Sequence, residues 1–314
     1  MAHRLSRREF LKVGAAGAAA VGLSGSWTRL LQAEEPAALA TVDLAVGHGA
    51  AADAVRGAVD LLGGMSAFVK KGDFVFLKPN MSFGTPPEMG ATTHPEVVAT
   101  VARLCMDAGA GRVLVGDHTI RAPEVCLEYT GIQAACEGMD KVNVVALNDW
   151  AYFEDIVLPD GRALQTTSLA SDVRRADVLI NLPVAKSHSA AGVAFGIKNL
   201  MGLVWDRKVF HTKDLNQCIA DLASAVRPAL TIMDATRALV QGGPSGPGRT
   251  EPLNQVVAGI DPLAVDSYTL SLAKWYNRRF TPRQVRHFVA ARDLGVGSMD
   301  VEAFRVAHAG ETTD

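Results

Sequence analysis

The sequence predicts an α/β fold: a mostly parallel sheet flanked by helices, with a cleft at the carboxyl ends of its strands. Short apolar runs alternate with segments whose apolar residues recur every three or four positions. This alternation is typical of parallel strands joined by helical crossovers. Of the 314 residues, 48% are hydrophobic and 20% are charged, which indicates a globular protein with a large core.

The expected strands are buried apolar runs, and the expected helices are bounded by proline, acidic residues and glycine. Strands are predicted over residues 42–47, 73–80, 111–117, 141–147, 176–183, 229–234 and 255–260. Helices are predicted over 51–62, 94–109, 123–138, 261–276 and 281–294. We expect a short hairpin over 152–164 around Asp160-Gly161, and a loop over the Gly- and Pro-rich residues 241–252.

The N-terminus has the pattern of an export signal. Arg7-Arg8 and the following Phe10-Leu11-Lys12 resemble a twin-arginine motif, and a short Ala- and Gly-rich run comes next. Small residues at Ala38–Ala40 suit a signal peptidase. We therefore expect a signal peptide over 1–40 and a periplasmic or otherwise exported protein. Only an uncleaved leader would hold it on a membrane, because the apolar run is short for a membrane span.

After the leader we expect one α/β domain over residues 41–300, which the length also allows to divide into two lobes, and a C-terminal tail over 301–314. The net charge is −2, and no basic run with interleaved aromatics is present, so no nucleic-acid partner is expected. The four cysteines form no C-x-x-C pair, so no ferredoxin-type cluster is expected. Cys126 and Cys136 could pair in an oxidising compartment, but the sequence leaves this open.

Polar residues follow several of the expected strands, where ligands bind in parallel sheets. Lys78 and Asn80 end one strand and are candidates to bind an anion. Thr93 and His94 precede the 94–109 helix, whose free N–H groups favour negative charge. Thr93 is also the expected cap of this helix.

The segment 181–202 carries titratable side chains among small residues. Lys186 and His188 are two positions apart and would share one face of an extended segment, and Lys198 and Asn199 lie on an expected short helix. Glycines in such a segment let the backbone approach a ligand. We interpret Lys186, His188 and Lys198 as candidate catalytic groups and Asn199 as an anion-binding one. His188, His211 and Asp234 are candidate metal ligands.

Several ordered motifs resemble the domain of unknown function 362 family. They are "LKPN", "TTHPEVV", "ADVLINLPVAKSHSAAGVAFGIKNLMGLV", "IMDATRAL" and "AGIDPLAVDS", within about residues 41–295. Many relatives carry an attached iron–sulfur module, whose cysteine motif this chain lacks. The resemblance implies a fold and no settled reaction.

A more distant resemblance is to nickel-pincer lactate racemases. His188, Lys198 and His211 occur in the order of that family's proton-exchanging histidine, cofactor-bearing lysine and nickel-binding histidine. Asn148 or a neighbour stands where that family has another catalytic histidine, and "FGIKN" replaces its lysine context. This resemblance implies nickel or another transition metal as cofactor.

These observations lead to two functional hypotheses. In the first, the exported protein binds a metal or redox cofactor and a small anionic molecule in a cleft lined by lysine and histidine. It then catalyses a redox or isomerisation step, and a redox partner protein is a further candidate partner. In the second, it is a non-enzymatic periplasmic anion-binding, accessory or maturation protein. The second requires the lysines but not His188 as a proton shuttle.

Overall fold

The structure, a computed structural model, describes residues 42–310, and the expected leader with its cleavage site lies outside them. Within this range one large sheet has the strand order β12-β1-β11-β10-β7-β2-β3-β4, with β8 paired to β10 and β9 paired to β8. The strands of this sheet are β1 (Leu44–His48), β2 (Phe74–Pro79), β3 (Arg112–Asp117), β4 (Val142–Ala146), β7 (Val178–Leu182), β8 (Val184–His188), β9 (Gly192–Ala194), β10 (Leu230–Gln241), β11 (Arg249–Gly259) and β12 (Val306–Ala309).

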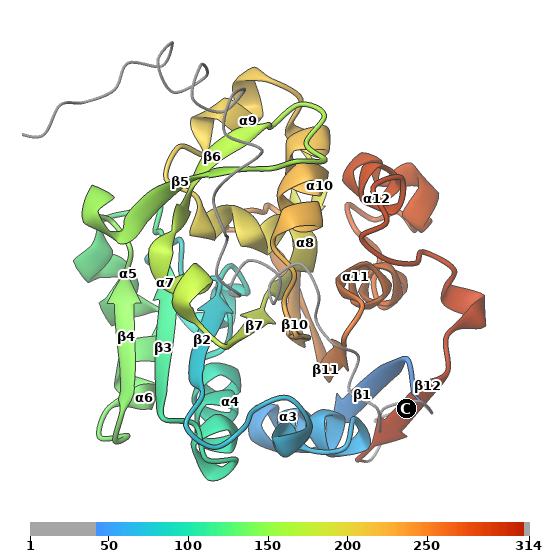
Figure 1. The fold of residues 1–314 in the computed structure, drawn as a ribbon. Coiled ribbons are helices and arrows are strands. Elements are labelled where there is room, and N and C mark those ends of the chain that lie inside the picture. The colour runs from blue at the N-terminus through green and yellow to red at the C-terminus, as the bar shows by residue number, and fades with distance from the viewer. Residues whose placement is uncertain (1–41, 311–314) are drawn as a thin grey trace, which may run out of the picture.

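Helices cover both faces of this sheet (Figure 1). They are α3 (Ala51–Leu61), α4 (Pro95–Asp107), α5 (Pro123–Tyr129), α6 (Ile132–Cys136), α7 (Ser171–Arg175), α8 (Gly196–Asn199), α9 (Lys208–Thr212), α10 (Leu215–Ala225), α11 (Pro262–Ser271) and α12 (Arg286–Arg292). The predicted α/β fold with a mostly parallel sheet flanked by helices is confirmed. None of the helices in residues 42–310 combines the length and hydropathy of a membrane span.

The alternation of side chains along each strand separates two cores. In β2, Phe74 and Phe76 belong to the core that packs against α8, α10, α11 and α12. Val75 and Leu77 belong to the core that packs against α3, α4 and α6. Successive side chains of a strand point to opposite faces, so an uninterrupted apolar run is what a strand buried on both faces requires.

The pairing of the strands is parallel from β10 through β7, β2 and β3 to β4. It is antiparallel between β1 and β11 and between β10 and β11. The parallel strands β2, β3 and β7 therefore end at the same edge of the sheet. At Pro183 the chain leaves β7 and continues as β8, which pairs with β10 further along that strand.

Several elements differ from the sequence predictions. The expected helix 123–138 is two helices, because Gly131 has a φ of 69° that a continuous helix does not allow. The hairpin is β5 (Phe153–Val157) with β6 (Thr166–Ala170), so its second strand lies beyond the predicted range. The expected loop 241–252 is shorter, because β10 extends to Gln241 and β11 begins at Arg249.

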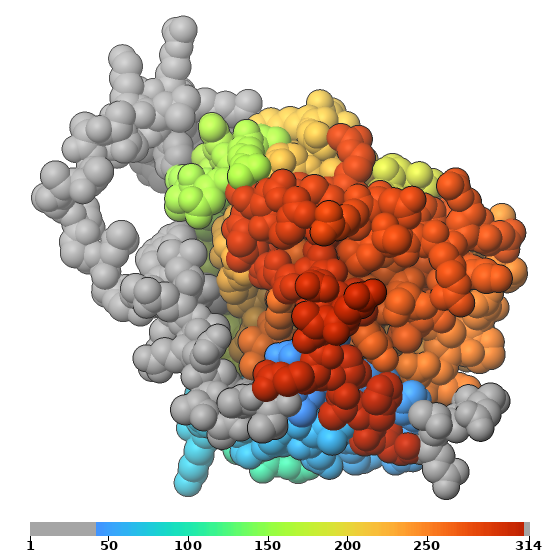
Figure 2. Space-filling model, turned by 90° about the vertical axis from the view of Figure 1, so that its right-hand side faces the viewer, coloured from blue at the N-terminus to red at the C-terminus, as the bar shows by residue number. Residues whose placement is uncertain are grey.

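The C-terminal residues also differ from a simple tail. Within the predicted tail 301–314, β12 pairs in parallel with β1 and so joins the edge of the sheet. Arg305 and Asp43 form an ion pair of 2.8 Å next to this pairing. Figure 2 shows C-terminal residues, drawn orange to red, over much of one face of the molecule, beside the blue N-terminal residues.

Candidate functional site

A buried ion pair lies at the carboxyl ends of β2 and β3. Lys78 Nζ is 3.0 Å from Asp117 Oδ1, and neither side chain is exposed. The other carboxylate oxygen of Asp117 accepts hydrogen bonds from the Met81 N–H and the Ser82 hydroxyl, both at 2.9 Å. Burial lowers the pKa of Lys78, and the charge of Asp117 opposes that shift. Lys78, predicted to bind an anionic ligand, thus has a carboxylate of the protein as its partner.

The turn that follows α8 covers this ion pair. A Cβ placed on Gly202 would lie 2.0 Å from Asp117 Oδ1 and 2.8 Å from Lys78 Nζ, so only glycine fits there. The Gly202 carbonyl accepts a hydrogen bond of 2.8 Å from the His118 N–H. Arg207 donates to the His118 and Thr119 carbonyls. The 196–207 segment is therefore fixed to the ends of β2 and β3.

Three asparagines and a threonine link the strand ends to α8. Asn199 donates its amide to the Lys78 carbonyl (3.1 Å) and to Asn181 Oδ1 (2.9 Å), and accepts from Asn80 Nδ2 (3.1 Å). Thr93 Oγ1 donates to the Leu182 carbonyl and accepts from the Asn80 N–H. The structure brings the predicted Asn80, Thr93 and Asn199 together with Asn181, but their amide N–H groups and the Thr93 hydroxyl bind within the protein.

The N-terminus of α4 is closed by protein groups. His94, not Thr93 as predicted, is the N-cap, and its Nδ1 accepts from the Glu96 N–H at 3.2 Å. The reason is that Thr93 already binds Asn80 and Leu182. Asp234 Oδ2 accepts from the His94 N–H at 2.7 Å, while its Oδ1 accepts from the N–H and hydroxyl of Thr236. The carboxylate of Asp234 occupies the place at this helix end where a bound anion was predicted.

Lys186 is a buried lysine without a carboxylate in contact. It is 1% exposed and lies on β8, where its Nζ donates to the Ala91 carbonyl and to Asn80 Oδ1 (3.2 Å). The ammonium also lies 4.8 Å from the centre of the Phe83 ring. Among residues 42–310 it forms no ion pair. Burial and the charge of Lys198 lower its pKa well below the usual value.

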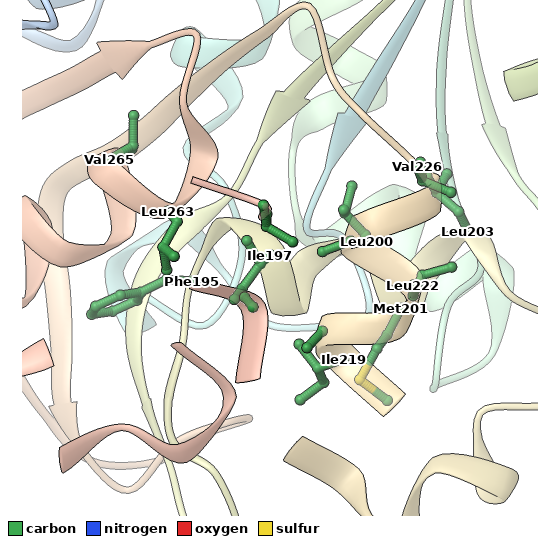
Figure 3. Packing of buried hydrophobic residues seen from close by; sticks show 14 of the residues in the cluster. Phe195, Ile197, Leu200, Met201, Leu203, Ile219, Leu222, Val226, Leu263 and Val265 are labelled. Carbon is green, nitrogen blue, oxygen red and sulfur yellow. The ribbon is translucent and has the colours of Figure 1, made fainter. Parts of the chain in front are cut away.

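Lys198 lies on α8, which is held from two sides. Asp266 on α11 accepts hydrogen bonds from the Gly196 N–H (2.7 Å) and the Ile197 N–H (3.0 Å). Figure 3 shows Ile197 and Leu200 among the apolar side chains of α10, with Phe195 beside Leu263 of α11. Apolar packing and a buried carboxylate therefore fix a helix of only four residues.

The half-buried Nζ of Lys198 has the Met201 sulfur as its described contact, at 3.6 Å. Burial, with a contribution from the Arg207 charge, lowers the pKa of Lys198 to about 8. With this pKa, the Lys198 ammonium can lose its proton at a pH only slightly above neutral. Burial also raises the pKa of Asp266 to about 8, against the opposing effect of its two N–H donors.

The charge of Lys198 acts on three histidines, His188, His211 and His287. His188 Nδ1 accepts from the Ala190 and Ala191 N–H groups, which leaves Nε2 to face other groups. Burial, then the charges of Lys198 and Lys186, lower the pKa of His188 to about 3, so its ring is neutral at pH 7. His211 is exposed, and burial and Lys198 lower its pKa. His287 on α12 is fully buried, and sequence reasoning did not select it.

The predicted metal ligands do not form a metal-binding group. In the part of the chain that the structure describes, no three His, Cys, Asp or Glu side chains are arranged to hold a metal ion. Asp234 is bound by His94 and Thr236, and His188 Nδ1 by two backbone N–H groups. The residues present therefore do not fit a nickel site made of His188, His211 and Asp234. Cys126 and Cys136, like Cys105 and Cys218, are free and buried.

The family of the chain follows from its central region, which contains the site residues described above except His287 on α12. Residues 75–271 match the model described as a domain of unknown function, DUF362. The chain belongs to the DUF362 family. This confirms the resemblance seen in its motifs. Residues 4–24 of this DUF362 protein match the twin-arginine translocation signal sequence, so the protein is exported by that route.

Known proteins similar to this DUF362 protein include a thylakoid-associated protein of Synechocystis sp., 32% identical over 223 residues that cover 68% of this chain and 66% of the relative. One similar solved structure is the lactate racemase apoprotein of Thermoanaerobacterium thermosaccharolyticum, with 14% identity, a TM-score of 0.47, and coverage of 74% of this chain and 58% of that one. Another is a Thermotoga maritima protein, with 10% identity, a TM-score of 0.34, and coverage of 52% and 46%. The chain thus spans less than two thirds of the length of each.

Proposed function

We propose that this exported DUF362 protein binds a small oxyanion, a carboxylate or phosphate, between Lys186 and Lys198. The observation that carries the proposal is the contrast among three lysines. Lys78 is neutralised by Asp117 at 3.0 Å, whereas Lys186 and Lys198 have no carboxylate in contact within residues 42–310. Burial of an unpaired ammonium is costly, by several kcal/mol per ion. A bound anion would supply the missing partner.

The surroundings of the two lysines suit a negative ligand. Burial is the main cause of the lowered pKa of Lys186 and of His188, and the positive charge of Lys198 lowers both further. The charge of Lys186 also lowers the pKa of His188. The carboxylate whose charge raises the pKa of Lys186 is that of Asp117, which already pairs with Lys78. His188 stays neutral at pH 7 and can add a hydrogen bond without further positive charge.

Proton transfer is the chemistry that the arrangement favours. A general acid or base is most effective when its pKa is near the working pH, and Lys198 has a pKa of about 8. A bound oxyanion would raise that pKa, and a neutral His188 could accept or return the proton. We propose Lys198 as the proton donor and His188 as its counterpart, in an isomerisation-type reaction. Without that step, the same site would serve a binding or accessory protein.

Calorimetric titration with sulfate, inorganic phosphate, acetate and oxalate tests the binding proposal. The wild type should bind at least one of them, and Lys186→Met and Lys198→Met should each lose about tenfold or more in affinity, as expected for removal of a charged hydrogen bond. Lys71→Met, at an exposed lysine, is the control and should bind as the wild type does. A wild type that binds none of the four anions would refute the proposal.

Exchange with solvent separates the enzyme from the binding protein. In D₂O, an enzyme that moves protons would incorporate deuterium at a C–H position of a bound carboxylate, which NMR detects. His188→Gln should stop this exchange and leave the affinity of the anion within about threefold, since glutamine retains a neutral hydrogen-bonding group. Binding with no exchange on any carboxylate tested would favour the accessory role.

A further inference from the structure

His287 is a buried polar side chain that the rest of the protein does not use. It lies on α12, its exposed fraction is 0%, and neither ring nitrogen has a hydrogen-bond partner within residues 42–310. Buried side-chain nitrogens nearly always have a partner, and a group without one calls for an explanation. In His287 both ring nitrogens lack a partner, which makes the departure from this rule larger.

His287 lies within range of the charge of Lys198, and its helix α12 packs against α10 and α11. The ring of its neighbour Phe288 lies 6.4 Å from that of Phe195, the residue that precedes α8. The charge of Lys198 acts on His287, and His287 acts in turn on His188. Figure 1 shows α12 beside α11, whose Asp266 binds the first N–H groups of α8. His287 is therefore buried within electrostatic range of Lys198 and His188.

An apolar side chain would fill this position without the cost of an unpaired imidazole. The ring of His287 lies 4.9 Å from that of Phe288, which belongs to the same hydrophobic core as Phe195 and Trp275. A leucine or methionine of similar volume would suit this core. A buried donor or acceptor without a partner destabilises a protein by about 1–3 kcal/mol. The imidazole is thus explained better by a ligand than by packing.

We infer that His287 forms the inner side of the oxyanion site and donates a hydrogen bond from a ring N–H to the anion held by Lys186 and Lys198. This inference deepens the proposed function and rests on it. A neutral imidazole has one N–H donor, and an oxyanion has free acceptor oxygens, so the two are complementary. The ring is neutral at pH 7, so it adds a directional contact without placing a third positive charge beside the two ammonium groups.

The ligand class that follows is a compact oxyanion with at least two oxygens that can be contacted at once. One oxygen would face an ammonium group, and another would reach the inner imidazole. Carboxylate and phosphate share this chemistry, so sulfate stands for the tetrahedral anion and oxalate for the planar one. Chloride has no oxygen atoms, so its affinity for the protein should not depend on His287.

The test compares His287→Leu and His287→Gln in the full exported protein by titration with sulfate and oxalate. His287→Leu should melt at the same temperature as the wild type or higher, yet lose about tenfold or more in affinity for the preferred oxyanion, as the loss of a hydrogen bond to a charged group predicts. His287→Gln, which keeps an N–H donor, should lose less. Equal affinity of the wild type and His287→Leu would overturn the inference and leave the proposed function intact.

A second measurement covers the case in which His287→Leu does not fold. In the wild type, the ring ¹⁵N resonances of His287, assigned by their absence in His287→Gln, should shift on addition of the anion. Unchanged resonances at saturating anion would overturn the inference. A wild type that binds neither sulfate nor oxalate would instead refute the proposed function, and the inference would fall with it.

Discussion

Lys78 and Asp117 form an ion pair of 3.0 Å in which neither side chain is exposed to solvent. The pair joins the ends of two adjacent parallel strands, β2 and β3, beneath the Gly202 backbone. It accounts for the buried Lys78 without any ligand. The pair therefore separates the structural lysine of this region from Lys186 and Lys198, which have no such partner in the described residues.

Replacement of Gly202 by alanine should destabilise the protein strongly. The new Cβ would lie 2.0 Å from Asp117 Oδ1 and 2.8 Å from Lys78 Nζ, so the ion pair must separate or the backbone must shift. Disruption of a buried pair costs about 3–5 kcal/mol. Urea denaturation at pH 7 measures the change in free energy of unfolding.

Gly138→Ala is the matched control for that substitution. Gly138 has a φ of 76° with nothing within 4 Å of an added Cβ, so only backbone strain of about 1 kcal/mol is expected. Equal losses for Gly138→Ala and Gly202→Ala would show that contact with the ion pair is not the cause.

Asp266→Ala should destabilise the protein and weaken anion binding together. The substitution leaves the Gly196 and Ile197 N–H groups without their acceptor, which costs about 1–3 kcal/mol per buried donor. It also releases the short helix that positions Lys198. Urea denaturation and sulfate titration measure the two effects. Retention of full sulfate affinity in a destabilised variant would show that α8 does not need Asp266 for its position.

The buried histidines should make the protein acid-sensitive. The pKa of His287 is about 3 in the folded protein, against the usual value near 6.5 in the unfolded chain. Between these values the unfolded chain binds a proton that the folded protein does not, so stability falls as the pH falls from 6.5 to 3. His287→Leu removes this contribution, and the wild type should lose up to about 1.4 kcal/mol per pH unit more than the variant. Parallel curves of unfolding free energy against pH would contradict the assignment.

Much of the fold could be predicted because its main strands are apolar on both faces. Runs such as 73–80 and 176–183 are characteristic of strands covered by helices on each side. The missed elements lack such patterns. The later half of β10 is interrupted by register shifts around Arg237 and Leu239, and β12 is held at the edge by pairing with β1, a contact between opposite ends of the chain.

The sequence predicted several residues of the candidate site, but not which of them bind to one another within the protein. The strand-end rule placed Lys78 and Asn80 at a strand end, and the structure joins both to Asn199 of the expected short helix. It could not show that Asp117 neutralises Lys78 or that Asp234 closes the α4 N-terminus, since both depend on contacts between distant segments. The cleft itself stays a prediction. His287 gave no local signal, because a histidine within an apolar helix is usually part of the core.

The most direct test of the central claim is the affinity for sulfate, a non-titrating oxyanion, measured from pH 6 to pH 10 in the wild type and in Lys198→Met. The pKa of Lys198 is about 8, lowered from 10.5, so its positive charge is present below pH 8 and lost above it. The wild type should bind with constant affinity below pH 8 and lose up to about tenfold per pH unit above it. Lys198→Met should bind weakly at every pH, without that fall. A wild-type affinity that is equal to that of Lys198→Met across the range would contradict the account.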